Sequence, residues 1–196
     1  MILNPAPQPG RDYGPGWAGF TFHLDSHLLS PAIALQTAPE AFRTGRLVPA
    51  HVFTVIDNNQ VAEALGQGYT IHPLAKYLDP ADARVTVWFA RPRGLTAKAA
   101  AFMAVTARLW AEGGTPYDLG AIGGFVLEEQ RRLQAGLRNR LEDPDRLFCS
   151  EAYVRLLQLA ARLFDPALPE AIRARHASSW SPWGLWQCEG LWVTTA

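Results

Sequence analysis

The sequence predicts an α+β domain in which a mostly antiparallel sheet packs against helices. The chain has 196 residues, the size of one domain, and 48% of them are apolar while only 18% are charged, so a sizeable core can form. Strand-forming patterns gather in the first half of the chain, and the longest helical patterns come after them. This order favours the α+β class, with helices covering one face of the sheet.

Alternating apolar residues predict the strands. The predicted strands cover residues 17–24, 51–56, 60–65, 84–90 and 191–195. In the first of them Phe20 and Phe22 share one side. The second and third are separated by Asp57-Asn58-Asn59, which predicts a β-hairpin.

Capping residues and helical spacing predict the helices. Ser30 followed by Pro31 marks a helix start, with one helix or two short ones extending through Phe42. Residues 73–78 allow a helical turn, and residues 115–140 are expected to be partly helical. The two long helices are predicted at residues 96–112, which Thr96 caps and Gly113-Gly114 end, and at residues 150–164, where apolar residues follow helical spacing.

Both ends of the chain differ from its middle. Residues 1–16 form a Pro-rich arm, and the domain of residues 17–196 ends in a segment with four of the seven tryptophans, which is interpreted mainly as core. The first ten residues lack the features of a secretory signal, and the longest apolar stretch is too short to span a bilayer. We therefore expect a protein without a membrane span, cytoplasmic by default, with delivery by another system or inclusion in a larger assembly left open.

The charge balance argues against polyanionic partners. Eighteen Lys and Arg residues balance eighteen Asp and Glu residues, so nucleic acid is not an expected partner. The arginines of residues 131–146 alternate with acidic residues that include Glu142, and the segment is interpreted as a solvated helical face. Glu151 is favoured where it stands because it lies in the first turn of a predicted helix.

Cys149 is the first candidate for chemistry. Two cysteines are too few for a disulfide scaffold or an all-cysteine metal site. Cys149 lies at the start of the predicted helix 150–164, where the helix dipole and unpaired N–H groups favour the thiolate. The alternative is a small buried apolar side chain. Cys188 has no histidine nearby in the sequence and is interpreted as structural.

His51 and Glu63 are the candidates for a supporting base and carboxylate. His51 opens a strand and shares a side with Phe53, either as a base or as a histidine with structural partners only. If the hairpin loop has an odd number of residues, Glu63 pairs with Phe53 and faces the same side as His51, whereas a two-residue turn would point it away. A carboxylate there would orient the imidazole, the third group that a nucleophile and base require. At an exposed edge Glu63 would have no such role.

These residues resemble a known family in their order and spacing. The strand that begins with Pro49-Ala-His51, the Glu63 twelve residues later, Tyr117-Asp118 and Phe148-Cys149-Ser-Glu-Ala-Tyr153 are similar to the circularly permuted branch of the NlpC-type papain-like cysteine peptidases, the YiiX-like group. That group is related to the lecithin retinol acyltransferase family. The resemblance covers roughly residues 19–185 and implies a permuted papain-like fold in which the strand that carries His51 precedes the helix that carries the nucleophile.

The resemblance also implies an activity. Cys149 would be the nucleophile, His51 the base and Glu63 the residue that orients His51, with Tyr117 as a further candidate site residue. The expected function is a cysteine-dependent hydrolase, an amidase or peptidase or an acyltransferase, that acts on cell-wall peptides or lipid-linked acyl groups. It requires no cofactor.

Two alternatives remain at this stage. The first is a papain-like binding or assembly module that has no catalytic activity, which a buried and unreactive Cys149 would favour. The second is a metal-dependent hydrolase, because His23, Asp25 and His27 alternate at a strand end with a spacing that can ligate a metal. The same three residues are more simply explained as solvated loop residues.

Overall fold

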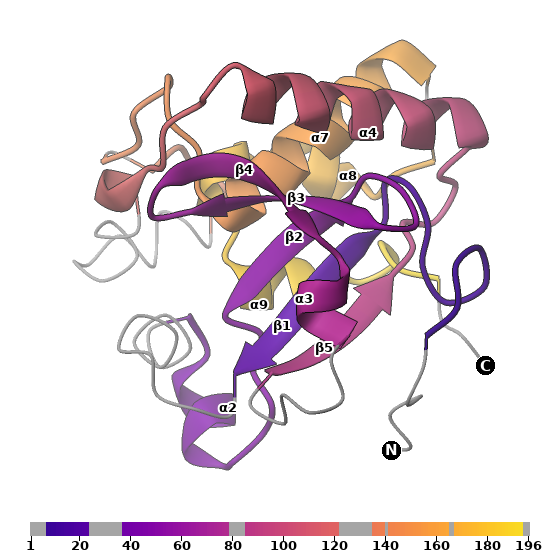
Figure 1. Cartoon of the computed structure of the whole chain (residues 1–196). Helices are drawn as coiled ribbons and strands as arrows, with labels where there is room; N and C mark the ends of the chain where they lie inside the picture. Colours follow the sequence, from indigo (N-terminus) through magenta and orange to yellow (C-terminus); the bar gives the residue numbers. More distant parts are fainter. Residues whose placement is uncertain are drawn as a thin grey trace.

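The computed structural model describes residues 7–23, 37–78, 85–121, 135–139, 141–164 and 167–193. Its centre is a five-stranded antiparallel sheet with the strand order β4-β3-β2-β1-β5, shown in Figure 1. The strands are β1 (Ala18–His23), β2 (His51–Val55), β3 (Gln60–Leu65), β4 (Gly68–Pro73) and β5 (Val85–Ala90). The α+β class with a mostly antiparallel sheet is therefore confirmed.

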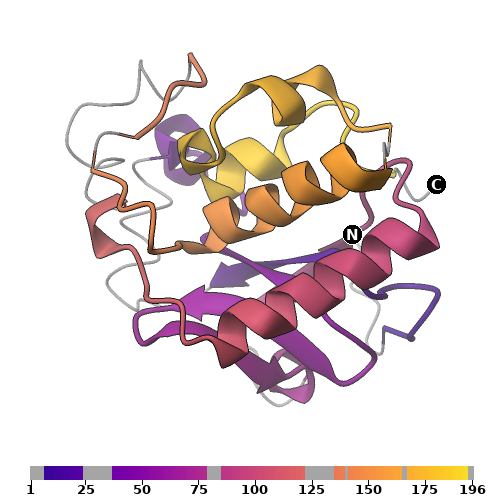
Figure 2. The same ribbon diagram turned by 90° about the horizontal axis from the view of Figure 1, so that it is seen from above.

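Two long helices cover one face of this sheet. They are α4 (Ala97–Glu112) and α7 (Cys149–Phe164), which lie side by side across the strands in Figure 2. The shorter elements are α2 (Pro39–Arg43), α3 (Ala75–Leu78), α8 (Glu170–Ala174), the 3-10 turn η1 (Ala177–Ser179) and α9 (Pro182–Trp186). Within the described ranges, none of the helices has the length and apolar content needed to cross a bilayer.

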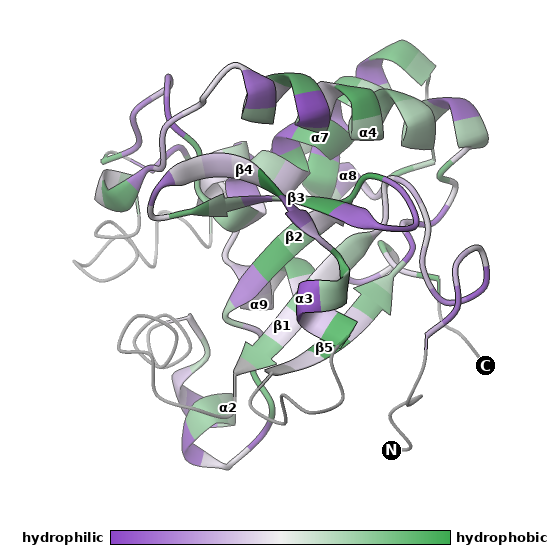
Figure 3. Cartoon of the chain, viewed as in Figure 1, coloured by the Kyte–Doolittle hydropathy of each residue, from purple (hydrophilic) through white to green (hydrophobic). Residues whose placement is uncertain are grey.

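The larger core lies between the sheet and the two long helices. Phe20 and Val52 of the sheet are fully buried against Met103 of α4 and Leu156 of α7. Figure 3 shows apolar residues running through the middle of β1, β2 and β5. The hydroxyl of the buried Tyr153 donates a hydrogen bond to the carbonyl of Gly16 at 2.9 Å, because a buried hydroxyl needs a partner.

A smaller core lies on the opposite face of the sheet, so the expectation that helices cover only one face is wrong. Phe53, Val55 and Val61 point to this side and pack with Tyr13 and with α3. The β1 residue opposite Phe53 is Gly19, and a Cβ atom there would overlap the Phe53 ring. Glycine at this position thus lets the ring lie flat over β1.

Substituting Gly19 tests this packing. We expect Gly19→Ala to lower the free energy of unfolding by about 1 to 3 kcal/mol, because the new methyl group displaces a ring that is fully buried. Gly66→Ala is the matched control, since a Cβ there meets no atom within 4 Å. Urea denaturation of both variants measures the difference, and equal stabilities would contradict this account of the smaller core.

Two elements differ from the sequence-based expectations, and a third is described only in part. Strand β4 was not predicted, although Tyr69 and Ile71 alternate with polar residues and the two-residue turn before it is Gly66-Gln67. The terminal strand at residues 191–195 is wrong over its described part, where Trp192 forms only an isolated bridge with Pro92. Of the helical segment that starts at Ser30, the structure describes α2, which begins at Pro39; residues 24–36 lie outside the described ranges.

The Trp-rich tail contributes to the larger core, as the sequence analysis favours. Trp186 and Trp192 contact the ring of Phe20 edge-on, with centroid separations of 5.1 and 5.3 Å. Trp180 and Cys188 are buried as well. The tail therefore covers the part of the sheet that α4 and α7 leave open.

Candidate active site

Cys149 is the first residue of α7 and is buried, with 5% of its surface exposed. Burial acts to raise the pKa of its thiol, but a hydrogen bond and the charge of His51 act against it, and the net shift of the pKa is downward. The backbone N–H groups of Val52 and Ser150 also point at the sulfur and favour the thiolate. Cys149 therefore has the surroundings of a nucleophile and not only those of a core residue.

The start of α7 is held by contacts with two other parts of the chain. The hydroxyl of Ser150 donates to the carbonyl of Trp180 at 2.6 Å and is completely buried. Leu147 pairs with Tyr117 in a short parallel bridge just before the helix begins. These contacts fix the direction in which the Cys149 side chain leaves the helix.

His51 connects the sulfur to a carboxylate. It is the first residue of β2, in the middle of the sheet, and 13% of its side chain is exposed. Its Nε2 atom lies 2.8 Å from Oε2 of Glu63, which leaves Nδ1 for Cys149. Burial acts to lower the pKa of the imidazole, but the hydrogen bonds and charges of Cys149 and Glu63 raise it to about 10. The raised pKa of His51 and the lowered pKa of Cys149 both favour a thiolate–imidazolium pair.

Glu63 faces His51 because of the hairpin register. Thr54 pairs with Ala62 and Val55 with Val61, and the loop between Ile56 and Gln60 has three residues, an odd number. If this pairing is continued by one residue in each strand, Glu63 lies opposite Phe53. The condition stated from the sequence is met, and the contact between His51 and Glu63 that it predicts is present.

The Glu63 carboxylate is completely buried and has more partners than His51 alone. Oε1 lies 3.1 Å from Nζ of Lys76, and Oε2 accepts a short hydrogen bond from the hydroxyl of Tyr77. His72 Nε2 lies 3.9 Å from Oε1. Burial acts to raise the pKa of this carboxyl, but His51, Tyr77 and Lys76 lower it to about 2. Glu63 is therefore a permanent anion at neutral pH.

Lys76 and Tyr77 are site residues that the sequence analysis missed. Both belong to α3, which follows the strand β4 that was not predicted, so no pattern placed them near Glu63. The Tyr77 ring stacks on Phe53 with centroids 4.6 Å apart, and this contact aims its hydroxyl at the carboxylate. Burial and the Glu63 charge raise the pKa of Tyr77, so the phenol stays a donor.

Tyr117 lies in the segment that pairs with Leu147, directly before Cys149. Burial raises the pKa of its phenol, and the charges of Cys149 and Asp118 raise it further. The sulfur and the phenol are thus close enough to interact electrostatically. Tyr117 remains protonated and is available as a hydrogen-bond donor near the nucleophile.

The remaining candidates are the three possible metal ligands and Cys188. Asp25 and His27 lie outside the described residues, as does the side chain of His23. Elsewhere in the described chain, no group of three or more His, Cys, Asp or Glu side chains is arranged to hold a metal ion. Cys188 differs from Cys149, because burial raises the pKa of its thiol and Arg175 opposes this only in part.

Comparison with known proteins does not assign a family. No family model matches this chain, and no curated protein matches it in sequence. The chemical interpretation of the site therefore rests on its own geometry.

Proposed function

We propose that this protein is a cysteine-dependent hydrolase or acyltransferase with a circularly permuted papain-like fold. The observation that carries the proposal is the buried chain of contacts from Cys149 through His51 to Glu63. Such a chain supplies a nucleophile, a base and a group that orients the base. The order of the elements supports the permutation, since β2 with His51 precedes α7 with Cys149.

The first half of the reaction forms a thioester. The Cys149 thiolate attacks the carbonyl carbon of an amide or ester, and the carbonyl oxygen becomes an oxyanion. The amide N–H of Cys149, which has no partner within the helix at this first position, is the natural donor to it. When the tetrahedral intermediate collapses, the bond to the amine or alcohol breaks and His51 gives its proton to the leaving group. Glu63 stabilises the imidazolium until that transfer.

The second half returns the enzyme to its starting state. Water or an acceptor alcohol or amine attacks the thioester carbonyl while neutral His51 takes its proton. The carbon–sulfur bond then breaks, Cys149 leaves as the thiolate, and the imidazolium pairs with it again. Every proton moves between the substrate, His51 and the acceptor, so the cycle needs no metal or organic cofactor. The resemblance to the YiiX-like group suggests cell-wall peptides or lipid-linked acyl groups as substrates.

Alkylation kinetics test the nucleophile directly. The rates at Cys149 and Cys188 are measured by mass spectrometry between about pH 5 and 9, with iodoacetamide, in the parent protein and in His51→Ala. We expect Cys149 to react well below the ~8.5 midpoint of an ordinary thiol, because the thiolate is paired with His51. Cys188 is the internal control, since its surroundings disfavour the thiolate.

The outcome of this experiment decides the proposal. His51→Ala is expected to shift the reactivity of Cys149 toward the ordinary range and to leave Cys188 unchanged. A Cys149 that reacts with the same pH dependence in both proteins would remove the chemical basis of catalysis.

The second candidate function is a papain-like binding or assembly module without activity. The observation that favours it is the burial of Cys149, with 5% of its surface exposed. Under this alternative Cys149 would be inert to small reagents at all pH values in the native protein and would react only after unfolding.

A further inference from the structure

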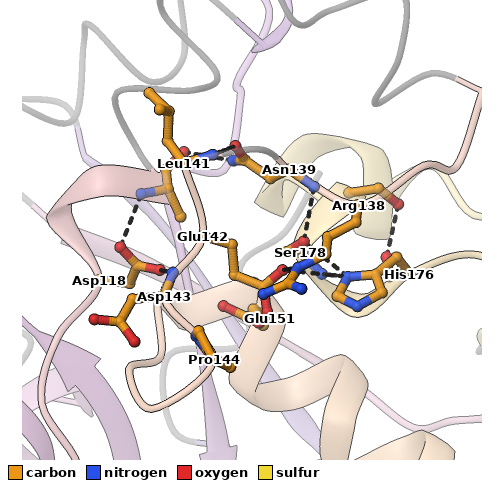
Figure 4. Close-up of polar contacts among 12 residues, drawn as sticks. Asp118, Arg138, Asn139, Leu141, Glu142, Asp143, Pro144, Glu151, His176 and Ser178 are labelled. Carbon is orange, nitrogen blue, oxygen red and sulfur yellow. Dashed lines mark hydrogen bonds and ion pairs between the residues drawn. The ribbon is translucent and has the colours of Figure 1, made fainter.

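Two buried glutamates, Glu142 and Glu151, lie outside the contacts described so far (Figure 4). Glu151 belongs to the first turn of α7, two residues after Cys149, and its side chain is completely buried. Glu142 approaches it from the segment that precedes α7, and 1% of its side chain is exposed. The expectation that Glu142 belongs to a solvated helical face is therefore wrong.

Two arginines and a histidine surround this pair, and they do not satisfy all four of its oxygens. Arg155 Nη2 lies 2.8 Å from Oε1 of Glu142 and 2.7 Å from Oε1 of Glu151. On its other oxygen Glu142 has Nε of Arg138 at 2.9 Å and Nδ1 of His176 at 3.5 Å. Oε2 of Glu151 is buried and lacks a hydrogen-bond partner if it is only an acceptor.

One proton on Glu151 would give its Oε2 atom a hydrogen-bond partner. If Oε2 of Glu151 carries a proton, it donates to Glu142, and the pair holds one negative charge, which lies next to the guanidinium groups of Arg155 and Arg138. Burial and Glu142 raise the pKa of Glu151 to about 8, against the effect of Arg155. Burial acts in the same direction on Glu142, but Ser178, Arg138 and His176 lower its pKa. Burial lowers the pKa of His176, so its imidazole is mainly neutral at neutral pH.

The pair connects two segments that flank Cys149. The residue after Glu142 donates its N–H to Oδ2 of Asp118 at 2.8 Å. Further along, the N–H of Asp118 donates to the carbonyl of Leu147 at 3.1 Å, and the N–H of Leu147 donates to the carbonyl of Pro116 at 3.0 Å. Tyr117 lies between Pro116 and Asp118, so both bonds hold its backbone beside Leu147. The contact between Glu142 and Glu151 thus adds to the backbone bonds of Leu147 in holding the segment that includes Tyr117 near the first turn of α7.

We propose that Glu142 and Glu151 form a proton-dependent latch that holds the Tyr117 segment against the start of α7 and restricts access to Cys149. While the pair shares one proton, the latch is closed. When the proton is lost, two buried carboxylates share Arg155, and their repulsion weakens the contact between the segment and the helix. The role in access rests on the proposed function of Cys149, whereas the latch itself is a property of the fold.

A comparison of two thiol reagents tests the latch. Cys149 is alkylated with iodoacetamide, a small reagent, and with a polyethylene glycol maleimide, a bulky one, between about pH 6 and 9.5. The quantity followed is the rate with the bulky reagent divided by the rate with the small reagent. Both reagents need the thiolate, so the ratio cancels the ionisation of Cys149 and reports access. We expect the ratio to rise about tenfold in the parent between pH 7 and 9.5, following the ionised fraction of Glu151.

Two variants separate the latch from other effects of pH. Glu151→Gln keeps a donor toward Glu142 and cannot ionise, so its ratio is expected to stay constant. Glu112→Gln, at the exposed end of α4, should behave as the parent. A constant ratio in the parent, or a Glu151→Gln protein that follows the parent, would overturn the latch.

Hydrogen exchange in the unmodified protein provides a second test that does not depend on a variant or on thiol chemistry. Protection of the amides in residues 141–153, relative to those of α4, is expected to fall between pH 7 and 9.5. Unchanged relative protection would overturn the latch. If Cys149 has no dependence on His51 but this protection still falls, the proposed catalysis is wrong and the latch stands.

Discussion

Glu63→Gln is expected to reduce the rate of acyl transfer about 10³-fold while the protein remains folded. The carboxylate stabilises the imidazolium through the 2.8 Å contact with Nε2 of His51. A glutamine of the same shape keeps an acceptor for His51 and Tyr77 but provides no charge, and neutralising the orienting carboxylate of a catalytic triad lowers the rate by up to about 10⁴-fold. The hydrolysis of an activated ester such as p-nitrophenyl acetate, under single-turnover conditions, measures it.

The pH dependence gives a signature that a structural defect would not produce. The Glu63 charge raises the pKa of His51, and His51 in turn lowers the pKa of Cys149. Without that charge, the midpoint for alkylation of Cys149 should move up by about one to two pH units. Asp57→Asn is the matched control, because this carboxylate lies on the same hairpin and is half exposed. Parent-like rates in Glu63→Gln would show that the carboxylate does not act through His51.

The sequence was sufficient for the part of the site that depends on local order. Cys149 at a helix start, His51 at a strand start and Glu63 in the facing strand follow from short patterns, and the side to which Glu63 points depended on the number of residues in the hairpin loop. That number decides the face on which a side chain lies, because side chains alternate along a strand. The central sheet was predicted for the same reason, apart from β4.

The contacts that complete the site come from parts of the chain with no local signal. Tyr77 reaches Glu63 only because β4 returns the chain across the sheet and because the ring rests on Phe53, which Gly19 accommodates. Glu142 looked like a surface residue, since acidic side chains beside arginines are usually solvated. Glu151 was explained by its place in the first turn of a helix, and that place does not predict burial. Their burial depends on how residues 141–147 and the turn near His176 pack against α7. Tertiary packing of this kind is not encoded in a short pattern.

The buried Glu151 should also make the stability of the protein fall with rising pH. Its pKa is raised from 4.5 to about 8 in the folded protein, so the folded state holds a proton that the unfolded chain releases. The stabilisation from this proton is complete below pH 4.5 and is lost as the pH rises to about 8. Linkage gives an upper bound of ~5 kcal/mol for that loss, and opening of the latch reduces it. The pKa of Glu142 is lowered from 4.5, so its protonation changes the stability only below about pH 4.5.

Glu151→Gln removes this linkage and is therefore expected to stabilise the protein increasingly from pH 5 to pH 8. The glutamine amide keeps a donor for Glu142. In the parent protein Glu151 must either stay protonated at a pH where an unfolded glutamate is ionised, or become a second buried charge, and both lower the stability. Urea denaturation at pH 5, 6.5 and 8, with the slope of the transition checked for constancy, measures the difference. Glu112→Gln should match the parent at each pH. A Glu151→Gln protein that is less stable than the parent at pH 8 would mean that Glu151 is ionised in the fold and that Arg155 stabilises its charge.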